Sequence, residues 1–157
     1  MTSSFVRFIG RPLSIAAGIL LLAGVQNASA QITSPIGFKT SFPFSVGEAQ
    51  MPAGSYTIRP DDSDPGILEL TGAHASVFFE VQAAAAPSTA KKTEVVFKRY
   101  GDGYVLKDIW LEGTTDGAEA VAVHREQKAA KRHGSATEHR VAATKKAAVK
   151  TATAASR

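Results

Sequence analysis

Apolar and polar residues alternate along the middle of the chain with the period of two that is typical of β-strands. The clearest run is FKTSFPFSV at residues 38–46, whose even positions include three phenylalanines and a valine. Pro43 interrupts this run and lacks the N–H group that a strand donates to its neighbour. We therefore expect this strand at a sheet edge or with a bulge at Pro43.

Shorter runs of the same kind follow, separated by segments rich in turn-forming residues such as DDSDPG at 61–66 and GTTDG at 113–117. Pro87 interrupts the alanine-rich segment 83–92, which we expect to be a loop. The pattern predicts a mainly β protein, a small antiparallel β-sandwich or partly open barrel of six or seven short strands. After the first run, the predicted strands are 55–59, 67–70, 75–81, 94–100, 104–111 and 119–123.

Two of these strands flank Gly101-Asp102-Gly103 and predict a hairpin, because either glycine can adopt a positive φ. A three-residue loop would place Phe97 opposite Lys107 and would pair apolar residues with charged ones across the hairpin. We therefore expect a bulge or a different loop length.

The segment 125–133 contains helix formers, has basic residues near its end and is followed by Gly134. It predicts one C-terminal helix and a β-rich domain over residues 31–133. Residues 134–157 are mainly Ala, Lys and Thr with no aromatic residue, so we expect a disordered basic tail.

The first thirty residues have the layout of a secretory signal peptide. Arg7 and Arg11 precede the apolar run LSIAAGILLLAGV, and Ala28-Ser29-Ala30 matches the small-residue pattern of a cleavage site. The run is too short for a typical membrane span. We expect cleavage after Ala30 and a periplasmic or extracellular protein without a membrane span, whose stability rests on core packing because the chain has no cysteine.

Charge divides the chain after the predicted signal. Residues 31–123 carry seven bases against twelve acids, whereas residues 124–157 carry nine bases against two acids. The overall net charge of +4 therefore reflects the C-terminal segment. That segment predicts a polyanion-binding region made of Arg125, Lys128, Lys131, Arg132, Arg140, Lys145, Lys146 and Lys150.

Export would favour an anionic lipid or polysaccharide of the cell envelope as the partner of this region. Nucleic acid would be the partner of a protein that stays inside the cell, and a purely solubilising tail is the simpler alternative. A second hypothesis is a small binding module for a sugar, a peptide or a hydrophobic ligand. Its β face would carry four aromatic residues, Tyr56, Tyr100, Tyr104 and Trp110. The other interpretation of these residues is packing in the core or across strands.

No motif predicts a catalytic residue, a cofactor or a metal site. Asp61, Asp62 and Asp64 lack the spacing of an EF-hand and are typical of an acidic turn. The spacing of the C-terminal histidines places no i, i+4 pair on one helix face. His74 lies near Ser76, but without a G-x-S-x-G element a hydrolase is the weakest alternative.

The stretches FKTSFPFSVGEAQMPAGSYTI and VVFKRYGDGYVLKDIW carry two further motifs, V-G-x4-P-A-G-x-Y and F-x-[KR]-Y-G-x-x-Y. In these motifs the chain resembles a group of small exported bacterial proteins, common in acidobacteria, to which no activity is assigned. The resemblance covers about residues 36–131 and implies export and a β-rich fold. It supplies no catalytic residue, so we expect an exported, non-enzymatic protein of the envelope.

Overall fold

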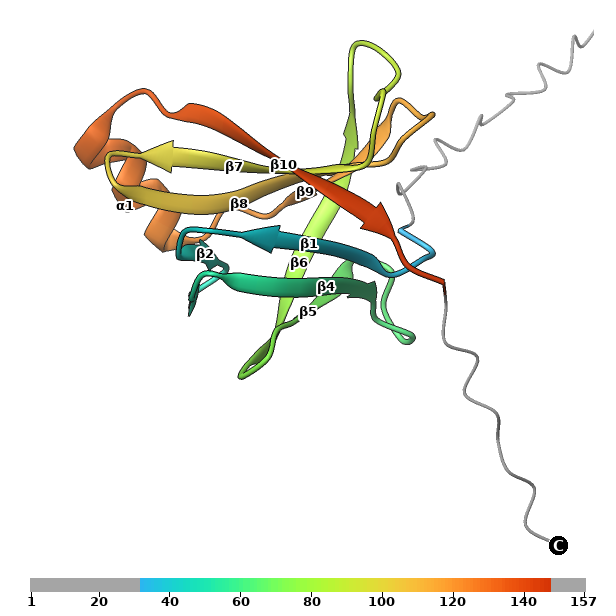
Figure 1. Cartoon of the computed structure of the whole chain (residues 1–157). Coiled ribbons are helices and arrows are strands. Elements are labelled where there is room, and N and C mark those ends of the chain that lie inside the picture. The colour runs from blue at the N-terminus through green and yellow to red at the C-terminus, as the bar shows by residue number, and fades with distance from the viewer. Residues whose placement is uncertain (1–31, 148–157) are drawn as a thin grey trace, which may run out of the picture.

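The computed structural model describes residues 32–147 and shows one closed barrel with a helix on its outer wall (Figure 1). Residues 1–31, with the predicted signal peptide, and 148–157 lie outside the described residues. The barrel strands are β1 (Ile36–Thr40), β4 (Gly54–Pro60), β5 (Ile67–Thr71), β6 (Ser76–Ala85), β7 (Glu94–Tyr100), β8 (Gly103–Trp110), β9 (Asp116–Ala120) and β10 (Thr137–Lys145).

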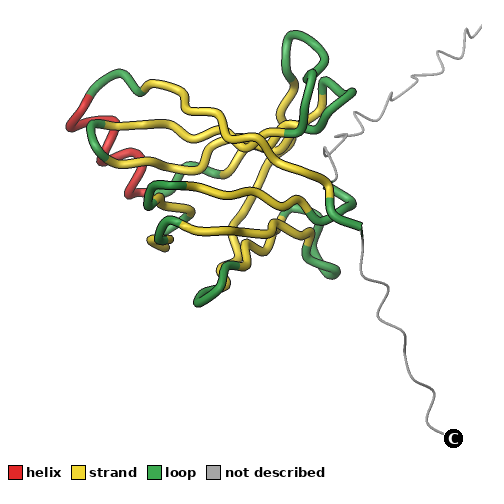
Figure 2. The backbone as a smooth tube through the Cα atoms, viewed as in Figure 1, coloured by secondary structure: helices red, strands yellow, loops and turns green. Residues whose placement is uncertain are grey.

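These eight strands pair in the order β1-β4-β5-β6-β9-β8-β7-β10, and β10 pairs with β1 to close the circle. Every pairing within the circle is antiparallel. The mainly β prediction is confirmed, but the expected sandwich or partly open barrel of six or seven strands is wrong. Closure leaves no free edge in the circle. Figure 2 shows that strands make up most of the described backbone.

The predicted first strand is divided into two. β1 ends at Thr40, and the chain turns through Pro43 into a hairpin of β2 (Phe44–Val46) and β3 (Ala49–Met51). β1 lies between β10 and β4, so Pro43 marks a break between strands and not a sheet edge. β2 makes a short parallel pairing with β8, and the hairpin adds Phe44, Val46 and Met51 to the barrel core.

The β7–β8 hairpin has both a bulge and a loop shorter than three residues, the two features that the mismatch of apolar and charged residues predicted. Its loop has two residues, because Tyr100 pairs with Gly103, and Gly101 has a φ of 59°. Phe97 then lies opposite Leu106, so two apolar residues face each other. A bulge between Val96 and Phe97 shifts the register so that Lys107 has no cross-strand partner on β7.

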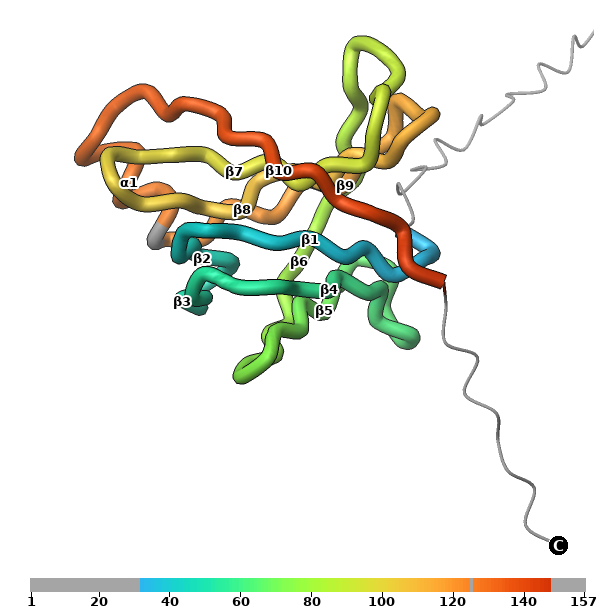
Figure 3. The backbone as a smooth tube through the Cα atoms, viewed as in Figure 1, coloured from blue at the N-terminus to red at the C-terminus, as the bar shows by residue number. Residues whose placement is uncertain are grey.

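The expectation of a disordered tail from residue 134 is wrong for 137–145, which form β10. β10 pairs with β7 along Thr137–Ala142 and with β1 along Ala143–Lys145. Figure 3 shows this last strand running between the other two. The β domain therefore extends well past residue 133, and the part of the predicted tail beyond Ala147 lies outside the described residues.

Side chains fill the barrel interior. Four aromatic rings pack together there with centroids 5.1–6.2 Å apart, those of Phe38, Phe44, Tyr56 and Phe97. Ile36, Ile58, Leu70, Val95 and Ile109 are among the residues that surround them, each with no exposed surface. An eight-stranded barrel is wide enough either to be filled or to hold one small ligand. This barrel is filled, so its candidate sites lie on the outer surface.

Candidate functional site

Helix α1 (His124–His133) lies against the outer wall of the barrel near the β7–β8 turn (Figure 1). The sequence predicted this helix and its end, and both are confirmed. Gly134 has a φ of 69°, and its amide donates a hydrogen bond to the carbonyl of Ala130. The helix therefore ends at the predicted residue before the chain enters β10.

One acidic side chain of α1 faces the barrel. Glu126 is buried and accepts a hydrogen bond of 3.3 Å from the hydroxyl of Tyr100 on β7. Lys107, which has no cross-strand backbone partner on β7, is also buried. Its ammonium group forms an ion pair with Glu119 on β9. Glu119 in turn accepts a hydrogen bond of 3.2 Å from Gln82 on β6. The helix thus lies over a polar cluster built on the barrel wall.

The pKa shifts in this cluster follow from burial and neighbouring charge. Burial alone would lower the pKa of Lys107, but its hydrogen bond to Glu119 and the negative charges around it raise that pKa. The hydrogen bond from Lys107 lowers the pKa of Glu119. Burial raises the pKa of the neighbouring Asp108, and the charge of Glu119 adds to that rise. Lys107 therefore remains an ammonium group at neutral pH.

The outer side of α1 carries only basic charge among its described side chains. Lys128, Lys131 and Arg132 are exposed, and their spacing of three and four residues places them on one side of the helix. None of the three has an ion pair or hydrogen bond with another described residue. We call these three residues the α1 basic face.

The other predicted polyanion-binding residues do not join this face. Arg140 on β10 binds the carboxylates of Glu94 and Glu138, which raise its pKa. Lys145 ends β10 and is exposed, and Lys146 follows it. Arg125 belongs to α1, but its side chain lies outside the described part, as does the whole of Lys150. The predicted region is thus divided among the helix, the middle of β10 and the residues at its end.

The four predicted ligand-face aromatics do not form one face. Tyr56 is in the core, stacked on Phe38, with its hydroxyl bound to the carbonyl of Pro52. Tyr100 is buried at its hydrogen bond to α1. Tyr104 stacks on Phe42, with ring centroids 4.0 Å apart. Trp110 is six residues further along β8, or about 20 Å away.

Asp61 in the acidic turn and His139 on β10 both make contacts that are typical of a structural role. Asp61 accepts hydrogen bonds from the amides of Ser63 and Asp64, so the turn interpretation is confirmed. His139 on β10 packs edge-on against Phe42. Within residues 32–147, no three Asp, Glu, His or Cys side chains are arranged to hold a metal ion.

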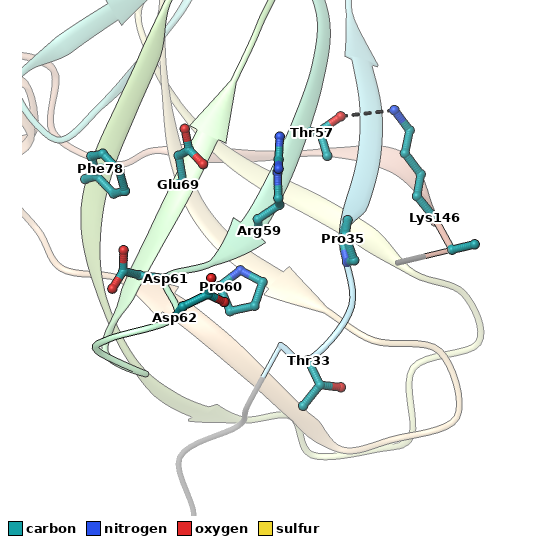
Figure 4. A pocket seen from close by; sticks show the side chains of 11 residues that line it. Thr33, Pro35, Thr57, Arg59, Pro60, Asp61, Asp62, Glu69, Phe78 and Lys146 are labelled. Atoms are coloured by element: carbon teal, nitrogen blue, oxygen red, sulfur yellow. Dashed lines mark hydrogen bonds between the residues drawn. The ribbon is translucent and has the colours of Figure 1, made fainter. Parts of the chain in front are cut away.

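A groove of about 500 Å³ lies on the outer face of β4, β5 and β6 (Figure 4). Arg59, Glu69 and Phe78 lie directly opposite one another across these strands, and Phe78 is 59% exposed. At its other side Lys146 donates a hydrogen bond of 3.0 Å to Thr57. Charges of both signs line this groove, and Lys146 alone of the predicted polyanion-binding residues lines it.

Sequence reasoning missed the roles of Glu126, Lys107 and Asp108. The mismatch of Phe97 with Lys107 in a hairpin with a three-residue loop was the signal for Lys107, because it predicted an irregular register at this point of β8. No comparable signal marked Glu126, since its burial depends on how α1 packs against the barrel.

The comparisons assign no relative to the chain: no protein-family model, no curated protein and no solved structure matches it. No helix within residues 32–147 has the length and apolar character that crossing a bilayer requires.

Proposed function

We propose that this is an exported, non-enzymatic protein of the cell envelope that docks on anionic surfaces through the α1 basic face. The observation that carries the proposal is the orientation of α1. Its one acid is buried against the barrel, while Lys128, Lys131 and Arg132 face solvent and have no acidic partner among the described residues. The layout of residues 1–30 and the resemblance to small exported bacterial proteins support the location.

Helix stability does not account for all three cations. The helix dipole favours bases in the last turn, which suits Lys131 and Arg132. Lys128 lies earlier, and its like-charged neighbours at i+3 and i+4 destabilise a helix by a few tenths of a kcal/mol. Such a concentration of positive charge on a rigid helix suits a surface of phosphate or carboxylate groups.

Binding of the purified chain to lipid vesicles tests this proposal. Each basic residue near an anionic bilayer contributes about 1 kcal/mol, so the triple variant Lys128→Gln, Lys131→Gln, Arg132→Gln should bind phosphatidylglycerol vesicles about 100-fold more weakly. Binding of the unaltered chain should weaken with added salt and should be much weaker on phosphatidylcholine vesicles.

A second triple variant is the matched control. Lys39, Lys91 and Lys92 are exposed and lie away from α1, and changing them to Gln removes the same net charge. This variant should bind nearly as well as the unaltered chain. Equal losses in the two variants would mean that net charge alone drives binding, and would contradict a dedicated face.

A further inference from the structure

A second recess lies on the outer wall of the barrel, beside the loop that follows β6. It measures about 510 Å³, and strands β7, β8 and β10 form its floor. Three backbone hydrogen bonds of 2.8–2.9 Å hold the loop to the turn between β8 and β9: Ala86 to Thr115, Ala90 to Thr114, and Gly113 to Ala90. The two turns project together from the barrel in Figure 1. Backbone hydrogen bonds therefore fix the loop that forms one side of the recess.

Trp110, the chain's one tryptophan, lines this recess from the end of β8. Its cross-strand partner is Gly117, where a Cβ atom would lie 2.3 Å from the indole ring. The ring therefore packs against the bare backbone of Gly117, which fixes its position. Trp110 remains partly exposed, so it presents an apolar surface to the recess.

Among the three acids that line the recess, Asp108 is the one without an ion pair or hydrogen bond to another described side chain. It lies two residues before Trp110 on the same side of β8 and is half-buried. The two other acids of the recess are engaged: Glu94 pairs with Arg140 and Lys92, and Glu138 with Arg140. Asp108 is thus placed to accept hydrogen bonds from a ligand.

The charges of the residues that line the recess indicate which class of ligand it suits. Three acids and three bases line the recess, so its net charge is zero. Balanced charge gives no general attraction for polyanions or polycations, whereas ionised side chains make strong hydrogen bonds to neutral hydroxyl groups. A fixed aromatic ring beside such groups suits the C–H face and the hydroxyl edge of a sugar.

We propose that this recess binds a neutral oligosaccharide, with Trp110 packing against a sugar ring and Asp108 accepting hydrogen bonds from its hydroxyls. The site is separate from the α1 basic face and does not depend on the proposed docking function.

Calorimetric titration of the full chain with cellotetraose and with chitotetraose tests the site, and Trp110 emission reports ligand contact directly. At least one sugar should bind and shift the emission. Asp108→Asn, which keeps the side-chain size, should weaken that binding about tenfold, the usual effect of losing a hydrogen bond to a charged group. Trp110→Phe should also weaken it, as measured by calorimetry.

Two controls separate this result from general effects. Asp102→Asn removes an exposed acid at the β7–β8 turn and should leave sugar binding unchanged, as should the triple variant of the α1 basic face. Failure of both sugars to bind at millimolar concentration would overturn the proposal. So would equal affinity of Asp108→Asn and the unaltered chain, or binding of trilysine in place of the sugars.

Discussion

At the scale of single residues, the bulge at Lys107 links the barrel to its helix. With the observed two-residue loop, an unbulged β8 would place this lysine opposite Val96, whereas the bulge places Asp108 there and leaves Lys107 on the outer wall without a cross-strand partner on β7. There it pairs with Glu119 and lies in the field of Glu126. A buried ammonium group is costly unless it is paired. The irregular register therefore has a clear consequence, which is a polar support beneath α1.

This pairing predicts a pH-dependent contribution to stability. The pKa of Glu119 is lowered in the folded protein, so the carboxylate stabilises the fold above its ordinary pKa of 4.5. The contribution is lost as the pH falls from there through the lowered value. Glu119→Gln removes the charged partner of buried Lys107 and should therefore reduce the free energy of unfolding at pH 7 by about 1–3 kcal/mol, with a smaller difference at pH 3.5. Urea denaturation at both pH values measures this.

Glu112→Gln is the control for that experiment. Glu112 is exposed, and its side chain has no partner among the described residues. The substitution should leave the unfolding free energy unchanged at both pH values. A loss for Glu119→Gln that is the same at pH 7 and pH 3.5 would contradict a role for its ionised carboxylate.

At the scale of elements, β10 determines whether the barrel closes. It is inserted between β7 and β1, so its removal would leave both of those strands with free edges. Its own side chains are mostly exposed, and only Val141 and Ala143 pack against the core. Most of its contribution thus comes from backbone pairing with two neighbours.

Truncation tests the importance of β10. A chain that ends at His133 should fail to form the barrel, whereas one that ends at Ala147 should fold like the full chain. Far-ultraviolet circular dichroism and a cooperative thermal transition measure the outcome. A folded, cooperative product from the shorter chain would show that β10 is dispensable and would restore the expectation of a disordered tail.

Local patterns predicted most elements, and they failed where tertiary pairing decided the structure. The hairpin at Gly101, the bulge and the helix ending at Gly134 all follow from nearby residues. β10 does not, because an Ala, Lys and Thr segment lacks the apolar positions that mark a strand. Its alternation of small inward residues with polar outward ones is too weak to detect without its neighbours.

The candidate sites were less predictable than the fold. Composition identified the basic segment, but α1 packing separated Lys128, Lys131 and Arg132 from the cations of β10. The four predicted aromatics were likewise divided between the core, the support of α1 and the outer wall. Sequence position does not reveal which side of a closed barrel a residue occupies when a bulge changes the register.

At the scale of the whole molecule, a filled barrel acts as a rigid support for its outer surface. The interior is occupied by packed aromatic and aliphatic side chains, so both proposed binding surfaces lie on the wall. Two proposed surfaces there differ in character: a basic helix for anionic surfaces and a charge-balanced recess for neutral sugar. A protein held at the envelope by the first would present the second to envelope glycans.

Fractionation of the native cells, with intact-mass analysis, tests whether the protein is exported and held at the envelope by α1. The chain should begin at Gln31, be recovered with the envelope and be released by a high-salt wash. The triple variant of the α1 basic face should be exported equally but found in the soluble fraction. An uncleaved cytoplasmic chain would rule out export and would make nucleic acid the partner to test. A variant that remains with the envelope would rule out docking through α1.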